Sequence, residues 1–204
     1  MNDVDDRDLL TGLANAGTAR RQLGDWLQAD DARVHALLLV LGRFDSVNLA
    51  HGADAGDFAL AEVARRITHF GQDEFLPGQW FAARIEGGKF LLATREECSR
   101  ERWQFLAEAL ADGIAQPLGG ITVALPQLWP HVALIRALAG DDPAGVLGRL
   151  SDAQIALRGE PGRRIVWIDR EDTPAGMGAI QVEAELRRAL DEGAVSLKFQ
   201  PQFA

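Results

Sequence analysis

The sequence predicts an α/β fold, a layered α+β sandwich in which helices flank a central sheet. Short apolar runs typical of strands alternate along the chain with longer segments whose apolar residues recur at helical spacing. The 204 residues are 47% hydrophobic and 25% charged, which is enough to bury a full core. Residues 34–41 are almost wholly apolar, as in a strand that is covered on both faces. This run is therefore the predicted central strand.

In the first half of the chain, apolar residues at helical spacing predict a helix over residues 19–27, before the central strand at 34–41. A polar loop follows, and residues 58–70 then predict a helix that packs back onto that strand. Residues 80–85 and 89–93 are apolar and lie only three residues apart. Two of those three residues are glycines, which adopt a positive φ readily, so a β-hairpin is expected here.

In the second half, the same periodicity predicts a helix over residues 103–114, a strand at 121–125 and a helix through 134–138. An Asp-Pro pair at 142–143 is a good helix start, and the helix it opens is expected to run to Leu157. Residues 164–168 predict the last strand of the sheet. Together these elements form the first predicted domain, residues 1–168.

Beyond it, residues 169–181 are rich in Gly, Pro and acidic residues and read as a linker. Residues 182–190 predict a new helix and residues 196–199 a strand that stops at Pro201. A lone strand leaves its backbone hydrogen-bonding groups unpaired. Residues 182–204 are therefore expected to be the start of a further, truncated domain.

The net charge of −9 repels polyanions, so we expect neither nucleic acid nor an anionic membrane surface as a partner. Cys98 is the only cysteine, which excludes an internal disulfide and a thiolate zinc cage. The four histidines are dispersed without metal-ligand spacing. The polar N-terminus is not a secretory signal, and no apolar run is long enough to span a bilayer. A cytoplasmic location is expected.

Four segments, in this order and spacing, resemble the GGDEF family, whose active members are diguanylate cyclases. They are Asp8-Leu-Leu-Thr11-Gly12-Leu13-Ala-Asn15, Phe44-Asp-Ser-Val-Asn48 with Gly56-Asp57, Arg84-Ile-Glu-Gly-Gly-Lys-Phe90, and Asp152 with Gly162-Arg163. The resemblance covers residues 8–168 and implies a mostly antiparallel sheet like that of nucleotidyl cyclases and polymerase palms. Residues 183–190 with Phe199-Gln200-Pro201 look like the opening of an EAL domain, the cyclic-di-GMP phosphodiesterase fold.

The departures from the family pattern concern metal binding. Active relatives have Gly-Gly-Asp/Glu-Glu-Phe at the hairpin, whereas Gly88 stands here at the metal-ligand position and Lys89 at the next acidic one. The other metal carboxylate falls on Val40, and a second Asp falls on Gly42. Phosphodiester formation from nucleoside triphosphates needs divalent ions held by oxygen ligands. No catalytic residue, metal site or cyclase activity is therefore expected.

Part of the nucleotide site is retained. Asn48 and Asp57 match the family's guanine-reading pair, with the alternative that Asn48 caps a turn and Asp57 caps the helix near Phe58. Phosphates are expected near Phe44 and Asp45, because the loop after the central strand offers backbone N–H groups. The resemblance implies two further phosphate contacts: Arg163 matches a phosphate-contacting arginine of the family, and the Lys89 ammonium stands where active relatives bind metal. Alternatively, Lys89 and Arg163 only point to water. The product-inhibition motif Arg-x-x-Asp is missing, since Pro77 and Trp80 occupy its places.

The leading hypothesis is a degenerate, non-catalytic GGDEF domain that regulates an attached EAL domain. GTP or GDP would bind without metal, through Lys89, and no other cofactor is expected. The alternative is an interaction module that binds no ligand and serves homodimerisation or partner docking. A third reading, residual cyclase activity, requires Glu86 to replace the lost metal ligand from two positions away in a tight turn.

Overall fold

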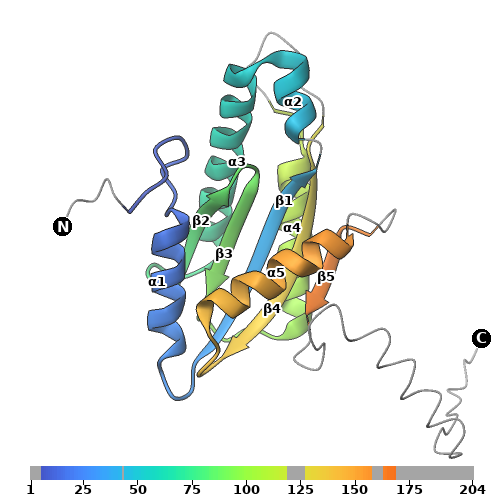
Figure 1. Cartoon of the computed structure of the whole chain (residues 1–204). Helices are drawn as coiled ribbons and strands as arrows, with labels where there is room; N and C mark the ends of the chain where they lie inside the picture. The colour runs from blue at the N-terminus through green and yellow to red at the C-terminus, as the bar shows by residue number, and fades with distance from the viewer. Residues whose placement is uncertain (1–5, 43, 119–126, 158–162, 169–204) are drawn as a thin grey trace, which may run out of the picture. The chain divides into compact units, whose positions relative to one another are not determined.

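The computed structural model describes residues 6–42, 44–118, 127–157 and 163–168, in which five strands form one sheet. The strands are β1 (Arg33–Gly42), β2 (Trp80–Glu86), β3 (Lys89–Thr94), β4 (Trp129–Leu138) and β5 (Ile165–Ile168). Their order is β2-β3-β1-β4-β5, and only the β4–β5 pair is parallel (Figure 1). The predicted mostly antiparallel α/β sandwich is confirmed.

The described residues contain five helices, of which four pack against the two faces of the sheet and the shortest packs on the longest (Figure 1). They are α1 (Ala16–Leu27), α2 (Phe44–His51), α3 (Ala53–Glu74), α4 (Arg100–Ala115) and α5 (Pro143–Leu157). Side-chain oxygens cap three of them: Asn15 accepts from the Thr18 N–H, Ser99 from that of Arg102, and Asp142 from that of Gly145. Within the described residues, no helix is long and apolar enough to cross a membrane.

The central strand β1 is buried on both faces, as predicted. Leu37, Leu39 and Leu41 belong to the core on the α3 and α4 side, whereas Leu38 and Val40 belong to the core on the α1 and α5 side. This alternation follows from the two-residue period of a strand, and it explains why residues 36–41 are apolar at every position. The strand therefore separates two hydrophobic cores.

The prediction of a helix through residues 134–138 is wrong, because these residues lie in strand β4. The segment pairs with β1 over ten residues, from Arg33 opposite Leu138 to Gly42 opposite Trp129, and with β5 on its other side. A strand between two others is buried on both faces and reads as a continuous apolar run, which short helices also show. The strand predicted at 121–125 lies outside the described residues, as do the linker and the second domain predicted over 169–204.

The predicted polar loop before residue 58 is also wrong, because residues 44–57 form α2 and the first turn of α3. Gly52 separates the two helices with φ of 85°, a conformation that suits glycine. Its N–H donates to the backbone carbonyl of Asn48. Helix α3 thus begins at Ala53, five residues earlier than expected.

An arginine of α3 holds the C-terminal end of α4. Arg66 on α3 reaches the C-terminal end of α4, where its guanidinium donates to backbone carbonyls whose helical partners are missing. The acceptors, at 2.8 to 3.3 Å, are Gly113, Ile114, Gln116 and Pro117. Its Nε donates to Glu62 at 2.9 Å. The contact places a positive charge at the negative end of the α4 dipole.

Candidate functional site

The predicted site residues gather at one end of the sheet, where β1 ends, α2 begins and the β2–β3 hairpin turns (Figure 1). Val40 is the register partner of Lys89, and the Leu41 N–H donates to the Gly88 carbonyl at 3.0 Å. Positions far apart in sequence are therefore neighbours, as a nucleotide site requires.

Apolar side chains surround positions 40 and 88, at which the family pattern predicts metal carboxylates. Val40 and Leu41 are each only 4% exposed. A Cβ atom added at Gly88 would lie 3.3 Å from the Leu41 Cβ and 3.4 Å from the Phe44 Cγ, which is tighter than ordinary packing. No hard oxygen ligand is supplied by the side chains at positions 40 and 88.

Gly42, the second departure on the strand, is held by β4. A Cβ atom there would lie 2.8 Å from the carbonyl oxygen of Trp129 and 3.1 Å from the Cε1 atom of His131. Because the first of these atoms belongs to the backbone, a side chain cannot be added without moving the strand. The close pairing of β1 with β4 therefore requires glycine at position 42.

The hairpin carries an ion pair between Lys89 and Glu86, whose Nζ and Oε1 atoms are 2.5 Å apart. The hydrogen bond from Lys89 and its positive charge lower the pKa of Glu86. The Lys89 side chain is 32% exposed and that of Glu86 68% exposed. Lys89 thus does not simply point to water, and Glu86 is bound to an ammonium group rather than available for a cation.

Asn48 and Asp57 are brought close together by the packing of α2 on α3. The Asn48 amide lies against Gly56, since a Cβ atom at Gly56 would overlap its Oδ1 atom at 1.8 Å. Asp57 is the next residue of α3, and both side chains are exposed. Asp57 lies inside the helix, so the alternative that it caps a helix near Phe58 is wrong. Asn48 lies in α2 rather than in a turn.

Phe44 is the first residue of α2, and its ring is buried in the core at 9% exposure. The backbone N–H groups in the first turn of a helix have no intrahelical acceptor, and the helix dipole makes this end attractive to anions. The position suits a phosphate near the backbone of Phe44 and Asp45. The side chain of Asp45 lies outside the described part of the structure.

Arg163 is exposed and precedes β5, where its Nε donates to the Ile165 carbonyl at 3.3 Å. Ile165 is paired with Val132 of β4, which is paired with Leu39 of β1. The register therefore places Arg163 at the same end of the sheet as Val40, but two strands away, or about 10 Å at the usual strand spacing.

An ion pair that pattern reasoning did not single out joins the N-terminal segment to the hairpin. The Arg84 Nη1 lies 3.3 Å from both carboxylate oxygens of Asp8, and the Arg84 Nε donates to the Gly87 carbonyl at 3.0 Å. Burial opposes ionisation, but hydrogen bonds from Thr11 and the charge of Arg84 lower the pKa of Asp8 overall. The two residues are 76 positions apart, so no local spacing could have indicated the pair.

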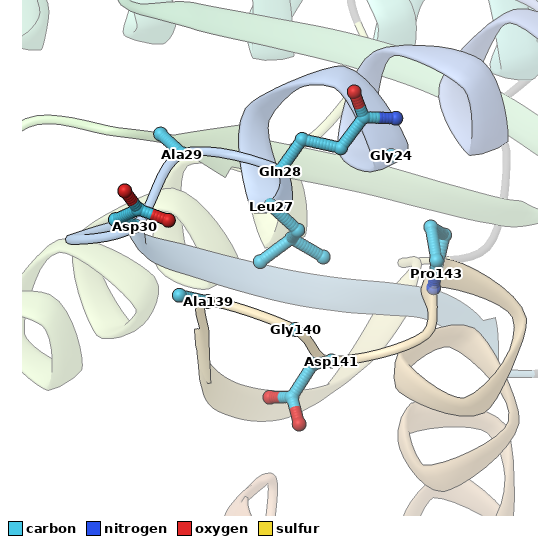
Figure 2. A pocket seen from close by; sticks show the side chains of 9 residues that line it. All are labelled: Gly24, Leu27, Gln28, Ala29, Asp30, Ala139, Gly140, Asp141 and Pro143. Atoms are coloured by element: carbon cyan, nitrogen blue, oxygen red, sulfur yellow. The ribbon is translucent and has the colours of Figure 1, made fainter.

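Among the described residues, no group of three or more His, Cys, Asp or Glu side chains is placed to hold a metal ion. A separate pocket of about 550 Å³ lies between the C-terminal end of α1 and the loop from β4 to α5 (Figure 2). It is lined by Asp30 and Asp141 among others, and Asp141 accepts from the Leu138 N–H and pairs with Arg149. Its acidic lining does not suit a nucleotide phosphate.

Comparison with known proteins agrees with this geometry. The family model described as "Diguanylate cyclase, GGDEF domain" matches residues 5–124. Uncharacterized proteins of Mycobacterium tuberculosis and Mycobacterium bovis are 27% identical over 204 residues, which cover 97% of this chain and 31% of each relative. The chain thus spans about a third of the length of the curated relatives it matches.

Solved structures share the fold. The diguanylate cyclase SiaD of Pseudomonas aeruginosa, solved with its activator SiaC, has a TM-score of 0.68 at 21% identity, over 79% of this chain and 61% of that one. The coiled coil and GGDEF domain of DgcB from Caulobacter crescentus, in complex with c-di-GMP, also gives 0.68 at 21% identity, over 81% and 87%. The FimX GGDEF domain of Pseudomonas aeruginosa gives 0.68 at 15% identity, over 78% and 98%. Because the family model covers more than half of the chain, the protein belongs to the GGDEF family of diguanylate cyclase domains.

Proposed function

We propose that this GGDEF domain does not catalyse, that it binds a guanine nucleotide without metal, and that it regulates an attached EAL domain in cyclic-di-GMP signalling. The observation that carries the proposal is the apolar end of β1. Val40 is 4% exposed, and the space beside Gly88 is bordered by Leu41 and Phe44.

The loss of catalysis follows from the chemistry of phosphodiester formation. Joining two nucleoside triphosphates requires divalent ions that neutralise the phosphates and activate the attacking hydroxyl. Magnesium is held by carboxylate and other hard oxygen ligands. Val40 and Gly88 supply none, and Glu86 is engaged by Lys89 at 2.5 Å. The site therefore favours binding over reaction.

Nucleotide binding is supported by the groups that remain. The exposed Asn48 and Asp57 are adjacent and offer the donors and acceptors that match the Watson-Crick edge of guanine. The first turn of α2 offers backbone N–H groups to a phosphate. Lys89, at the hairpin, supplies a positive charge where active relatives bind metal, so a phosphate would compete with Glu86 for its ammonium group.

The attachment to an EAL domain is supported by the sequence that follows the sheet. Residues 183–190 and 199–201 look like the opening of such a domain. The relatives in Mycobacterium are about three times as long as the aligned region, which leaves room for further domains. A domain that binds GTP without consuming it can act as a sensor for its neighbour, because binding shifts the equilibrium toward the conformation that holds the nucleotide more tightly.

Calorimetric titration with GTP tests the proposal. We expect saturable binding in EDTA that changes little with magnesium, and a loss of affinity of about tenfold or more in Asp57→Asn, since one good hydrogen-bonded contact contributes 1 to 3 kcal/mol. Asp54→Asn is the matched control, because Asp54 is also exposed on α3 and carries the same charge.

Three results would decide against parts of this proposal. Strict magnesium dependence would refute the role of Lys89. Absence of GTP binding would favour the interaction module, for which Leu49 of α2, 88% exposed, is a candidate contact. Formation of cyclic-di-GMP from GTP by this chain would show residual cyclase activity and overturn the assignment of Val40 and Gly88 as lost metal positions.

A further inference from the structure

A second polar pocket lies at the end of the sheet opposite to the hairpin, where β1 begins and α4 starts. Its volume is about 300 Å³, and its lining residues are Arg33, His35, Glu97, Cys98, Ser99 and Arg136. None of them belongs to the nucleotide site described above. The pocket brings two arginines, a histidine and the N-terminus of a 16-residue helix together.

His35 is the unusual member of this pocket. Its side chain is only 2% exposed, yet neither ring nitrogen has a hydrogen-bond partner. Its ring lies against Trp103, with the centroids 5.6 Å apart. Burial, and then the charge of Arg136, lower the pKa of His35 to about 4, while the nearby backbone of Glu96 opposes this. At neutral pH the ring is therefore uncharged and keeps one N–H donor, and within the described residues no acceptor meets its ring nitrogens in hydrogen-bond geometry.

The two arginines are poorly neutralised. Arg136 stands opposite His35 in the β1–β4 register, and no ion pair joins it to the described part of the chain. Arg33 lies 3.6 Å from Glu97, which is too long for a direct hydrogen bond, and the Glu97 side chain is 89% exposed. In a chain with a net charge of −9, this is a local concentration of positive charge.

Helix α4 adds its own preference for an anion. The first N–H groups of a helix lack intrahelical acceptors, and the dipole makes that end positive. Ser99, the N-cap residue, satisfies the N–H of Arg102 with its hydroxyl oxygen at 3.1 Å. A helix N-terminus alone would not make a site, but here it coincides with a buried, unpartnered histidine and an unpaired arginine.

We propose that this pocket binds a small phosphate monoester or inorganic phosphate. Arg136 and Arg33 would donate to the phosphate oxygens and displace the loosely held Glu97 into solvent. His35 would donate its free N–H after a small reorientation of the ring, which would remove the cost of leaving it unsatisfied. The pocket volume suits a compact phosphate rather than a dinucleotide.

The probe is inorganic phosphate, added to the chain at constant ionic strength while amide and imidazole signals are followed by NMR. We expect saturable shifts at Ser99 and in the His35 ring, and at least tenfold weaker binding in Arg136→Gln. Arg149→Gln is the matched control, because Arg149 is paired with Asp141 and is not among the residues that line this pocket. Glu97→Gln should bind phosphate more tightly, because the competing carboxylate is removed.

Shifts that rise linearly with phosphate, or that are equal in Arg136→Gln and Arg149→Gln, would overturn the proposal. The single cysteine offers a second readout that needs no substitution. Cys98 lines the pocket, so bound phosphate should slow its alkylation by a neutral reagent several-fold. An unchanged alkylation rate at phosphate concentrations that saturate the NMR shifts would place the anion elsewhere.

Discussion

Replacing Val40 with aspartate introduces the carboxylate that the family pattern predicts at this position and tests whether the strand end is part of the core. Val40 is 4% exposed and packs in the core on the α1 and α5 side. Losing its burial costs about 2 kcal/mol. Placing a polar group there adds about 1 to 3 kcal/mol.

Lys89 recovers part of this cost. It is the register partner of Val40, and paired residues point to the same face of a sheet, so the new carboxylate would lie within reach of its ammonium group. A partly exposed ion pair returns about 1 kcal/mol at most. The net loss for Val40→Asp is therefore about 3 kcal/mol in the free energy of unfolding.

Urea denaturation followed by far-UV circular dichroism, with and without excess magnesium chloride, measures this loss. We expect magnesium to have no effect, because a single carboxylate beside a lysine does not hold the ion. Val40→Asn is the isosteric control that shows the cost without charge. Stabilisation of Val40→Asp, but not of Val40→Asn, by more than about 1 kcal/mol in magnesium would refute the reasoning, since ligand binding raises stability by mass action.

Three further predictions concern stability. Arg66→Ala should lower the free energy of unfolding by about 1 to 2 kcal/mol in urea denaturation, because carbonyls at the end of α4 lose charged donors, and Arg66→Lys should restore less than half. Gly71→Ala should cost about 1 to 3 kcal/mol, since its Cβ would lie 2.4 Å from the Trp80 ring, and adding Trp80→Leu should relieve the strain. The pKa of Glu62 is lowered from 4.5 to about 2, chiefly by the side-chain hydrogen bond from Arg65. The ionised Glu62 should therefore stabilise the fold above pH 4.5, and this stabilisation should be lost as the pH falls toward 2. In Glu62→Gln, the free energy of unfolding measured by urea denaturation should no longer fall in this way between pH 4.5 and pH 2.

The sequence alone predicted the elements whose signals are local. The apolar run of β1, the two glycines of the hairpin, and the Asp-Pro start of α5 each depend on neighbouring residues, and all three were confirmed. Strand β4 was missed because an apolar run of Leu, Ile and Ala suits a buried helix as well as a strand. The segment forms a strand because it pairs with β1 and β5, and such long-range pairing cannot be inferred from neighbouring residues.

For the candidate site, the family pattern identified positions but not their environment. It located Gly88 and Lys89, but the contacts of Gly88 with Leu41 and the pairing of Lys89 with Glu86 come from the fold. The pocket around His35 had no sequence signal at all, because its residues are spread from position 33 to position 136. Spacing along a chain carries no information about neighbours that meet across a sheet.

The close approach of Gly42 to β4 also bears on how this domain could change. The Trp129 carbonyl oxygen would be 2.8 Å from any Cβ at position 42, so aspartate there requires the two strands to separate first. Any side chain at position 42 therefore needs a compensating change in the backbone of β4, so these two segments can change only together.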